Sequence, residues 1–94
     1  MNVFGKREAQ MQVEREYHGI SLQVISNYLV ELGGTMISED YVGDEGWSAT
    51  LRKGEPFILG ALRFATVRVH FKGDATVLKR LLATFDLRMI RPGG

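Results

Sequence analysis

Residues 20–34 read ISLQVISNYLVELGG, and this stretch decides how the rest of the chain can fold. Its apolar residues recur three and four positions apart, which places them on one face of an α-helix. Ser21 stands where its side chain can accept a hydrogen bond from an unpaired amide of the first turn. Gly33 or Gly34 can adopt the left-handed conformation that ends a helix. The pattern therefore predicts an amphipathic helix whose apolar face consists of Leu22, Ile25, Tyr28, Leu29 and Leu32.

Extended segments flank this helix on both sides. Before it, residues 10–19 alternate between apolar and polar side chains, which is the period of a half-buried strand. After it, we expect four extended segments, over residues 35–42, 46–53, 55–59 and 62–72. The tetrapeptide GDEG predicts a turn between the first two segments. Gly60-Ala61 fits a type II′ hairpin turn between the last two.

The side-chain parity of these segments indicates which residues face the core. Trp47, Ala49 and Leu51 share one face of their strand, opposite Ser48, Thr50 and Arg52. In the last strand Leu62 and Phe64 have the opposite parity to Val67, Val69 and Phe71. If both ends of that strand face the core, a bulge must lie near Ala65-Thr66. The predicted core comprises Ile25, Leu29, Leu32, Val67, Val69, Phe71, Leu78, Leu81, Leu82 and Phe85.

A second helix closes the chain. Asp74 is a suitable N-cap, and the apolar stripe that follows it ends near Leu87. The order is then strand, helix, four strands, helix, with short connections that make the sheet antiparallel. Two amphipathic helices are available to cover one face of that sheet. The predicted class is α+β, TATA-binding-protein-like or helix-grip, and the order differs from a ubiquitin-like β-grasp, which starts with a hairpin.

Size and composition exclude several classes of protein. Ninety-four residues suit a single domain, expected over residues 10–88 between flexible ends at 1–9 and 89–94. The net charge of +1 provides no overall field for nucleic acid or an anionic membrane. The absence of cysteine removes disulfides, thiolate nucleophiles and cysteine-based metal sites. No apolar run approaches the length of a membrane span. We expect a soluble cytoplasmic protein.

The sequence resembles a known family in three places. The run YHGISLQVISNYLVELGGT and the later EPFILGALRF and VRVHFKGD are similar to the C-terminal domain of MoaD-related proteins. The likeness covers roughly residues 13–94, and its motifs are turns, caps and packing faces. The resemblance implies a TATA-binding-protein-like fold with no established activity. In such proteins this domain follows a β-grasp sulfur carrier, and the present chain lacks that β-grasp half.

The chain ends in RPGG, and Gly93 and Gly94 are a candidate chemical handle. A ubiquitin-like sulfur carrier needs an unhindered C-terminus that an activating enzyme can adenylate and convert to a thiocarboxylate. The alternative is a flexible terminus without a role. The absence of the β-grasp order favours the second interpretation.

A cavity is another candidate site. Two helices over a curved sheet can enclose a ligand among aromatic side chains, whereas the same side chains more commonly fill a core at native packing density. A filled core is the favoured interpretation in a chain this short. The candidate lining residues are Tyr28, Trp47, Phe57, Phe64, Phe71 and Phe85.

Other polar residues carry weaker signals. His18 and His70 lack partners at metal-ligand spacing, so no metal site and no cofactor are predicted. The acidic residues are expected on solvated faces and in turns, and no catalytic residue is predicted. The basic residues of the sheet could form a nucleic-acid surface, but Glu14 and Glu16 are expected to offset their charge. That set is Arg52, Lys53, Arg63, Arg68, His70 and Lys72.

Three hypotheses about function follow. The favoured one is a small non-enzymatic accessory or interaction module associated with molybdopterin and sulfur-carrier systems, a link that the resemblance implies. The alternatives are a sulfur carrier or modifier activated at Gly94 and a helix-grip domain that binds a small apolar ligand. The expected partners are a second copy of the chain, through an exposed sheet edge, and a sulfur carrier or its activating enzyme. Neither nucleic acid nor a membrane is an expected partner.

Overall fold

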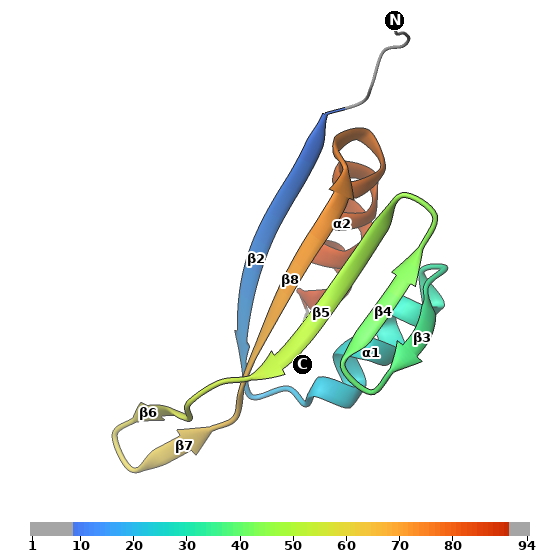
Figure 1. Ribbon diagram of the computed structural model, residues 1–94. Coiled ribbons are helices and arrows are strands. Elements are labelled where there is room, and N and C mark those ends of the chain that lie inside the picture. The colour runs from blue at the N-terminus through green and yellow to red at the C-terminus, as the bar shows by residue number, and fades with distance from the viewer. Residues whose placement is uncertain (1–8, 91–94) are drawn as a thin grey trace, which may run out of the picture.

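The computed structural model describes residues 9–90, and the structural statements below concern that part of the chain (Figure 1). The chain forms one strand, a helix, six further strands and a second helix. In order these are β2 (Gln10–His18), α1 (Leu22–Glu31), β3 (Thr35–Ser38), β4 (Tyr41–Asp44), β5 (Trp47–Lys53), β6 (Phe57–Leu59), β7 (Leu62–Phe64), β8 (Thr66–Asp74) and α2 (Ala75–Met89).

Five of the strands form one antiparallel sheet in the order β2-β8-β5-β4-β3. Strand β8 pairs with β2 on one side and with β5 on the other, so the first and last strands of the fold lie side by side (Figure 1). Strands β6 and β7 pair only with each other. The α+β class and the antiparallel sheet are confirmed.

The number of strands differs from the prediction. Residues 35–42 form two strands, β3 and β4, because the chain turns at Glu39-Asp40 and pairs back on itself. Residues 62–72 also divide, because the strand breaks at Ala65. The change of parity near Ala65-Thr66 was predicted to require a bulge within one strand. In the structure it coincides with a break between two strands, β7 and β8. Leu62, on the far side of that break, is exposed and does not face the core.

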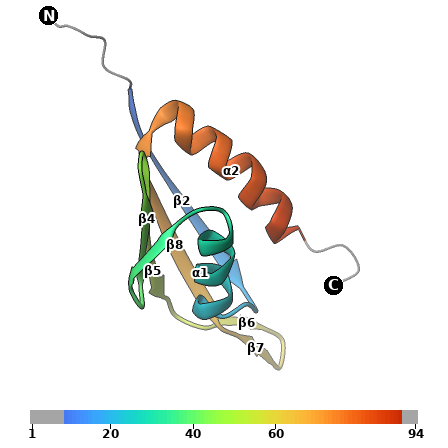
Figure 2. The ribbon, with the colours of Figure 1, turned by 90° about the vertical axis from the view of Figure 1, so that its right-hand side faces the viewer.

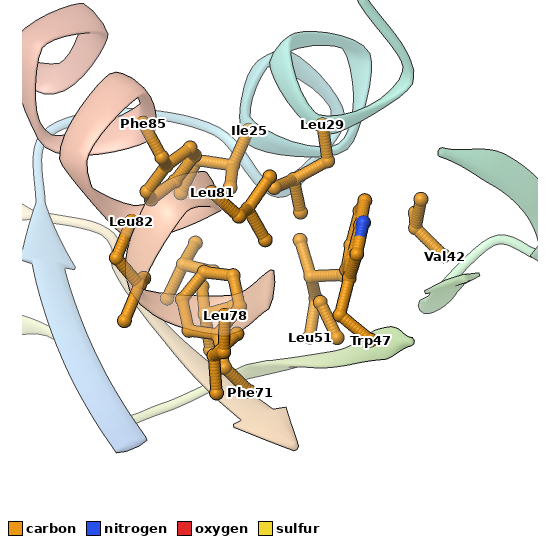
Figure 3. Packing of buried hydrophobic residues seen from close by; sticks show 13 residues of the cluster. Ile25, Leu29, Val42, Trp47, Leu51, Phe71, Leu78, Leu81, Leu82 and Phe85 are labelled. Carbon is orange, nitrogen blue, oxygen red and sulfur yellow. The ribbon is translucent and has the colours of Figure 1, made fainter. Parts of the chain in front are cut away.

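Both helices lie on the same face of the sheet (Figure 2). Figure 3 shows their side chains pointing toward those of β5 and β8. Every residue predicted for the core is buried there except Leu32, which is half-buried against it. The other buried hydrophobic residues are Val42, Trp47, Ala49 and Leu51, which confirms the predicted inward face of residues 47–51.

Local hydrogen bonds set the ends of both helices as predicted. The Ser21 side chain accepts from the Val24 amide, and the Asp74 side chain accepts from the Val77 amide. Gly33 has φ +112°, and the amides of Gly33 and Gly34 donate to the carbonyls of Val30 and Leu29. This is a Schellman motif, which satisfies carbonyls that the helix would otherwise leave unpaired. Helix α2 reaches Met89, two residues beyond the predicted end near Leu87.

The edge strand β2 is attached to α2 by a charged pair and an aromatic contact. Arg15 donates to both carboxylate oxygens of Asp86, at 3.0 and 3.4 Å. The ring of Tyr17 packs edge-on against Phe85, with 6.0 Å between centroids. The Tyr17 hydroxyl is buried and has no hydrogen-bond partner among the described residues. Burial, followed by the negative charge of Asp86, raises the pKa of Tyr17 to about 12.

The raised pKa of Tyr17 predicts a loss of stability at alkaline pH. The unfolded chain releases the Tyr17 proton near its usual pKa of about 10, whereas the folded chain retains it up to about 12. Between these values the folded form binds more protons, so the free energy of unfolding falls as pH rises, by up to roughly 2 kcal/mol. Tyr17→Phe should remove this contribution and cost no stability at pH 7, because it deletes an unpaired buried hydroxyl.

Urea unfolding at pH 7 to 12 measures this effect. Tyr41→Phe is the control, because Tyr41 is exposed on the other side of the sheet. A Tyr17→Phe variant whose stability declines with pH as steeply as that of the unmodified protein would contradict the prediction.

Candidate functional site

The β6–β7 hairpin projects from the two-layer body at one end of the sheet (Figure 1). Its two strands place Phe57 opposite Phe64 and Leu59 opposite Leu62. Because residues directly opposite share a face, these four side chains form one apolar surface, which we call the hairpin face. Its exposed fractions are 40% at Phe57, 59% at Leu59 and 60% at Leu62, and Phe64 is half-buried.

The turn and the root of the hairpin are well defined. Gly60 has φ +61° while Ala61 has a negative φ, which confirms the two-residue II′ turn. At the root, the His18 ring stacks on Phe57 with 4.2 Å between centroids. The amide of Gly19 donates to the carbonyl of Ala65, and that of Gly54 donates to Thr66. The hairpin is therefore anchored at its base, and its apolar tip extends into solvent.

Exposure of these side chains is energetically unfavourable. Burying one Leu or Phe side chain contributes about 1.5–3 kcal/mol, which the hairpin face forgoes in the isolated chain. A two-stranded hairpin is also only marginally stable unless it packs on another surface. This contiguous apolar surface on a projecting ribbon is therefore the candidate interaction surface of the described residues. Sequence reasoning predicted this turn and these strands but missed their exposure.

The structure separates the six residues predicted to line a cavity. Trp47, Phe71 and Phe85 lie in the core, where Phe71 and Phe85 pack edge to face at 5.4 Å between centroids. Phe57 and Phe64 lie on the hairpin, and the half-buried Tyr28 lies on α1 beneath the Arg88 guanidinium. None of the six lines either the groove beside β5 or the cleft on the polar face of the sheet. The proposed handle, Gly93 and Gly94, lies outside the described residues.

A groove of about 750 Å³ lies beside the free end of β5. The groove forms because β4 begins at Tyr41, which pairs with Thr50 of β5, whereas β5 continues beyond Thr50 to Lys53. Sequence reasoning did not find this groove, since its walls come from three elements distant in the sequence. They are the start of α1, strand β3 with the Glu39-Asp40 turn that follows it, and β5, which contribute Ser21, Leu22, Gln23, Ser26, Met36, Glu39, Asp40, Thr50, Leu51, Arg52 and Lys53.

The sheet face opposite the helices is polar, with charges of both signs. Glu16 lies 3.0 Å from the His18 ring and 3.8 Å from Arg68, and Glu14 lies 3.3 Å from the His70 ring. The predicted offset of basic residues by Glu14 and Glu16 is therefore present in the structure. Within residues 9–90, no three His, Asp or Glu side chains gather as metal ligands.

Comparison with known proteins identifies the family. A family model described as archaeal MoaD-like protein matches residues 13–94. The chain belongs to the archaeal MoaD-like proteins. The match spans most of the chain and confirms the resemblance to MoaD-related proteins. No curated protein matches the chain.

Family membership links this archaeal MoaD-like protein with molybdopterin and sulfur-carrier systems. The matched region contains the whole hairpin and most of the polar sheet face, and it includes Gly93 and Gly94. In the described part of the chain, neither helix is long and apolar enough to cross a membrane.

Proposed function

We propose that this archaeal MoaD-like protein is a non-enzymatic binding module of a sulfur-carrier system, and that the hairpin face docks a sulfur-carrier protein. The observation that carries the proposal is the apolar surface of Phe57, Leu59, Leu62 and Phe64, exposed on an anchored hairpin. Family membership supports the choice of partner. The arrangement of both helices on one face of the sheet supports the finer classification as TATA-binding-protein-like or helix-grip.

The shape of the site favours a protein over a small molecule. Small ligands bind in concave sites that enclose most of their surface, whereas the hairpin projects outward. Aromatic anchors at the root and aliphatic side chains at the tip are typical of the apolar centre of a protein interface. The exposed area of these four side chains together equals that of roughly two whole large side chains, or about 300–500 Å².

A stable interface requires more area than the hairpin face provides. Specific complexes bury about 800 Å² on each partner. A docked carrier must therefore also contact the surface around the root of the hairpin. That surface includes the stacked His18 ring and the polar residues of β2, so the expected interface has an apolar centre and a polar rim.

The test is a binding titration by calorimetry with the sulfur-carrier protein of the same organism. The double variant Leu59→Thr/Leu62→Thr removes the apolar tip and retains residues that favour strands. Loss of two anchor side chains should weaken binding by at least about tenfold. The control is Leu87→Gln, which removes a side chain of the same type, 73% exposed on α2, and preserves helix propensity.

Circular dichroism of both variants establishes that they fold. Equal affinity of the hairpin variant and the unmodified protein would contradict docking through the hairpin face, and an absence of binding by any form would contradict the choice of partner. Sedimentation of the same proteins tests the predicted homodimer. A dimer that dissociates in the hairpin variant would assign this surface to a second copy instead of a carrier.

A further inference from the structure

Two arginines stand directly opposite each other on the polar face of the sheet. In the pairing of β5 with β8, Arg52 lies opposite Arg68, and both belong to the outward-facing parity. Like charges at directly opposed positions of an antiparallel pair repel and destabilise the sheet. This pair therefore opposes folding of the isolated chain, by an amount that solvent screening limits because both side chains are exposed.

The neighbouring acids form an ion pair with only one of the two arginines. Glu16 contacts Arg68 at 3.8 Å through one oxygen, while its other oxygen lies 3.0 Å from His18. The carboxylate of Glu14 lies beside His70, in the adjacent row of the sheet. Within residues 9–90, Arg52 makes no ion pair or hydrogen bond. Arg52 therefore keeps its hydrogen-bond donors available in the cleft, although Glu14 and Glu16 balance the formal charge of the two arginines.

A cleft of about 260 Å³ opens at the same place. Its walls are formed by the two arginines together with Thr50, His70 and Glu14. The Thr50 hydroxyl supplies a donor one row away from the arginines, since Thr50 pairs with His70. Guanidinium groups donate two parallel hydrogen bonds to the oxygens of a phosphate or a carboxylate.

We propose that Arg52 and Arg68, assisted by Thr50, bind a single oxyanion group in this cleft. The group is the phosphate of a small molecule or the carboxylate of a peptide. Both present two or more oxygens that can accept hydrogen bonds from two guanidinium groups. Glu14 places one negative charge in the same cleft and so disfavours a second anionic group beside the first. The cleft contains none of the four side chains of the hairpin face, although Glu14 belongs to β2, whose polar residues are expected at the rim of the docked interface. Binding of an anion in the cleft does not depend on that docking.

The experiment is an NMR titration of the amide signals at constant ionic strength, with chloride as the balancing anion. One arm adds inorganic phosphate and the other adds acetyl-glycylglycine, so the two sources of the oxyanion are distinguished. Saturable shifts are expected at Thr50, Arg52 and Arg68 in at least one arm. Arg52→Thr should weaken that binding by about tenfold or more, because it removes charged hydrogen-bond donors.

Lys72→Thr is the matched control. It removes the same charge from the same face of β8, but Lys72 lies opposite Ser48 and Gln12, and it does not line the cleft. Binding by this variant should equal that of the unmodified protein. Shifts that fail to saturate in both arms, or equal weakening by Arg52→Thr and Lys72→Thr, would overturn the proposal.

Thermal unfolding provides a second readout. In chloride buffer Arg52→Thr should raise the melting temperature, because it relieves the repulsion from Arg68, whereas Lys72→Thr should not. The anion that binds should raise the melting temperature of the unmodified protein and leave that of Arg52→Thr unchanged. An Arg52→Thr variant that is equally stabilised by the anion would count against the site.

Discussion

Phe71→Ala should destabilise the protein by about 3–5 kcal/mol. Phe71 is fully buried on the interior strand β8, opposite Val13 of β2 and Ala49 of β5. Its ring packs edge-on against Phe85 of α2, so one side chain joins the sheet to the helix layer. Neither the small Ala49 nor the rigid strands can collapse into the vacated volume. A domain of this length has a total stability of roughly 5–14 kcal/mol, so the loss is a large fraction of it.

Urea unfolding followed by circular dichroism measures this loss. Phe57→Ala is the matched control, because it is the same substitution on the hairpin, where the ring is 40% exposed. That variant should lose clearly less stability, since its ring lies outside the core and stacks on His18 beside the hairpin partner Phe64. Equal losses in the two variants would mean that the hairpin belongs to the core, contrary to the structure.

Gly73→Ala should destabilise by more than the roughly 1–3 kcal/mol of an ordinary overpacked site. A methyl group at this position would lie 2.1 Å from the carbonyl oxygen of Gly46 and 2.7 Å from the Cα of Trp47. Both are backbone atoms, so no side-chain rotation can relieve the contact. The end of β8 would have to move away from the β4–β5 turn. That movement breaks the hydrogen bond from the Asp74 amide to the Gly46 carbonyl and disturbs the residue that caps α2.

Fluorescence of Trp47, the single tryptophan of the chain, reports on this contact directly. Its emission should shift toward that of an exposed indole in Gly73→Ala, together with a lower urea midpoint. Gly43→Ala is the control, because the tightest contact of its methyl group would be with the end of the Ile37 side chain, at 3.3 Å, and its other neighbours lie at ordinary distances of 3.8 and 3.9 Å. Retention of the native midpoint by Gly73→Ala would show that β8 and the turn are less tightly packed than the structure indicates.

In both the hairpin face and the Arg52–Arg68 cleft, the sequence predicted the local structure but not its position in the fold. The turn at Gly60-Ala61 was predicted from its residues, because a glycine with positive φ suits the twist of two paired strands. The exposure of Leu59 and Leu62 was not predicted, because apolar strands of this kind commonly face a core. The opposition of Arg52 and Arg68 depends on the register between β5 and β8, and sequence reasoning placed them only on a shared basic face.

The sequence by itself determined the helices, their caps and the inward parity of β5 and β8. Ser21, Gly33 and Asp74 act through hydrogen bonds that span three to five residues, so the interactions are visible in a short window of sequence. Burial of Val67, Val69 and Phe71 also follows from a period of two within a single strand. The resemblance to MoaD-related proteins was readable from the same local motifs.

Only the tertiary structure decided where the sheet ends. The pairing of β5 with β8 stops at Lys53 and Val67, the pairing of β2 with β8 stops at His18 and Thr66, and residues 57–64 pair with no strand of the five-stranded sheet. Residues 57–64 therefore pair with each other, and Phe57 and Phe64 leave the core that Phe71 occupies. Apolar side chains recur with a period of two on both sides of Ala65, with opposite parity, and that period cannot distinguish a strand covered by helices from one in solvent. That difference depends on which surfaces the helices reach, a property of the whole fold.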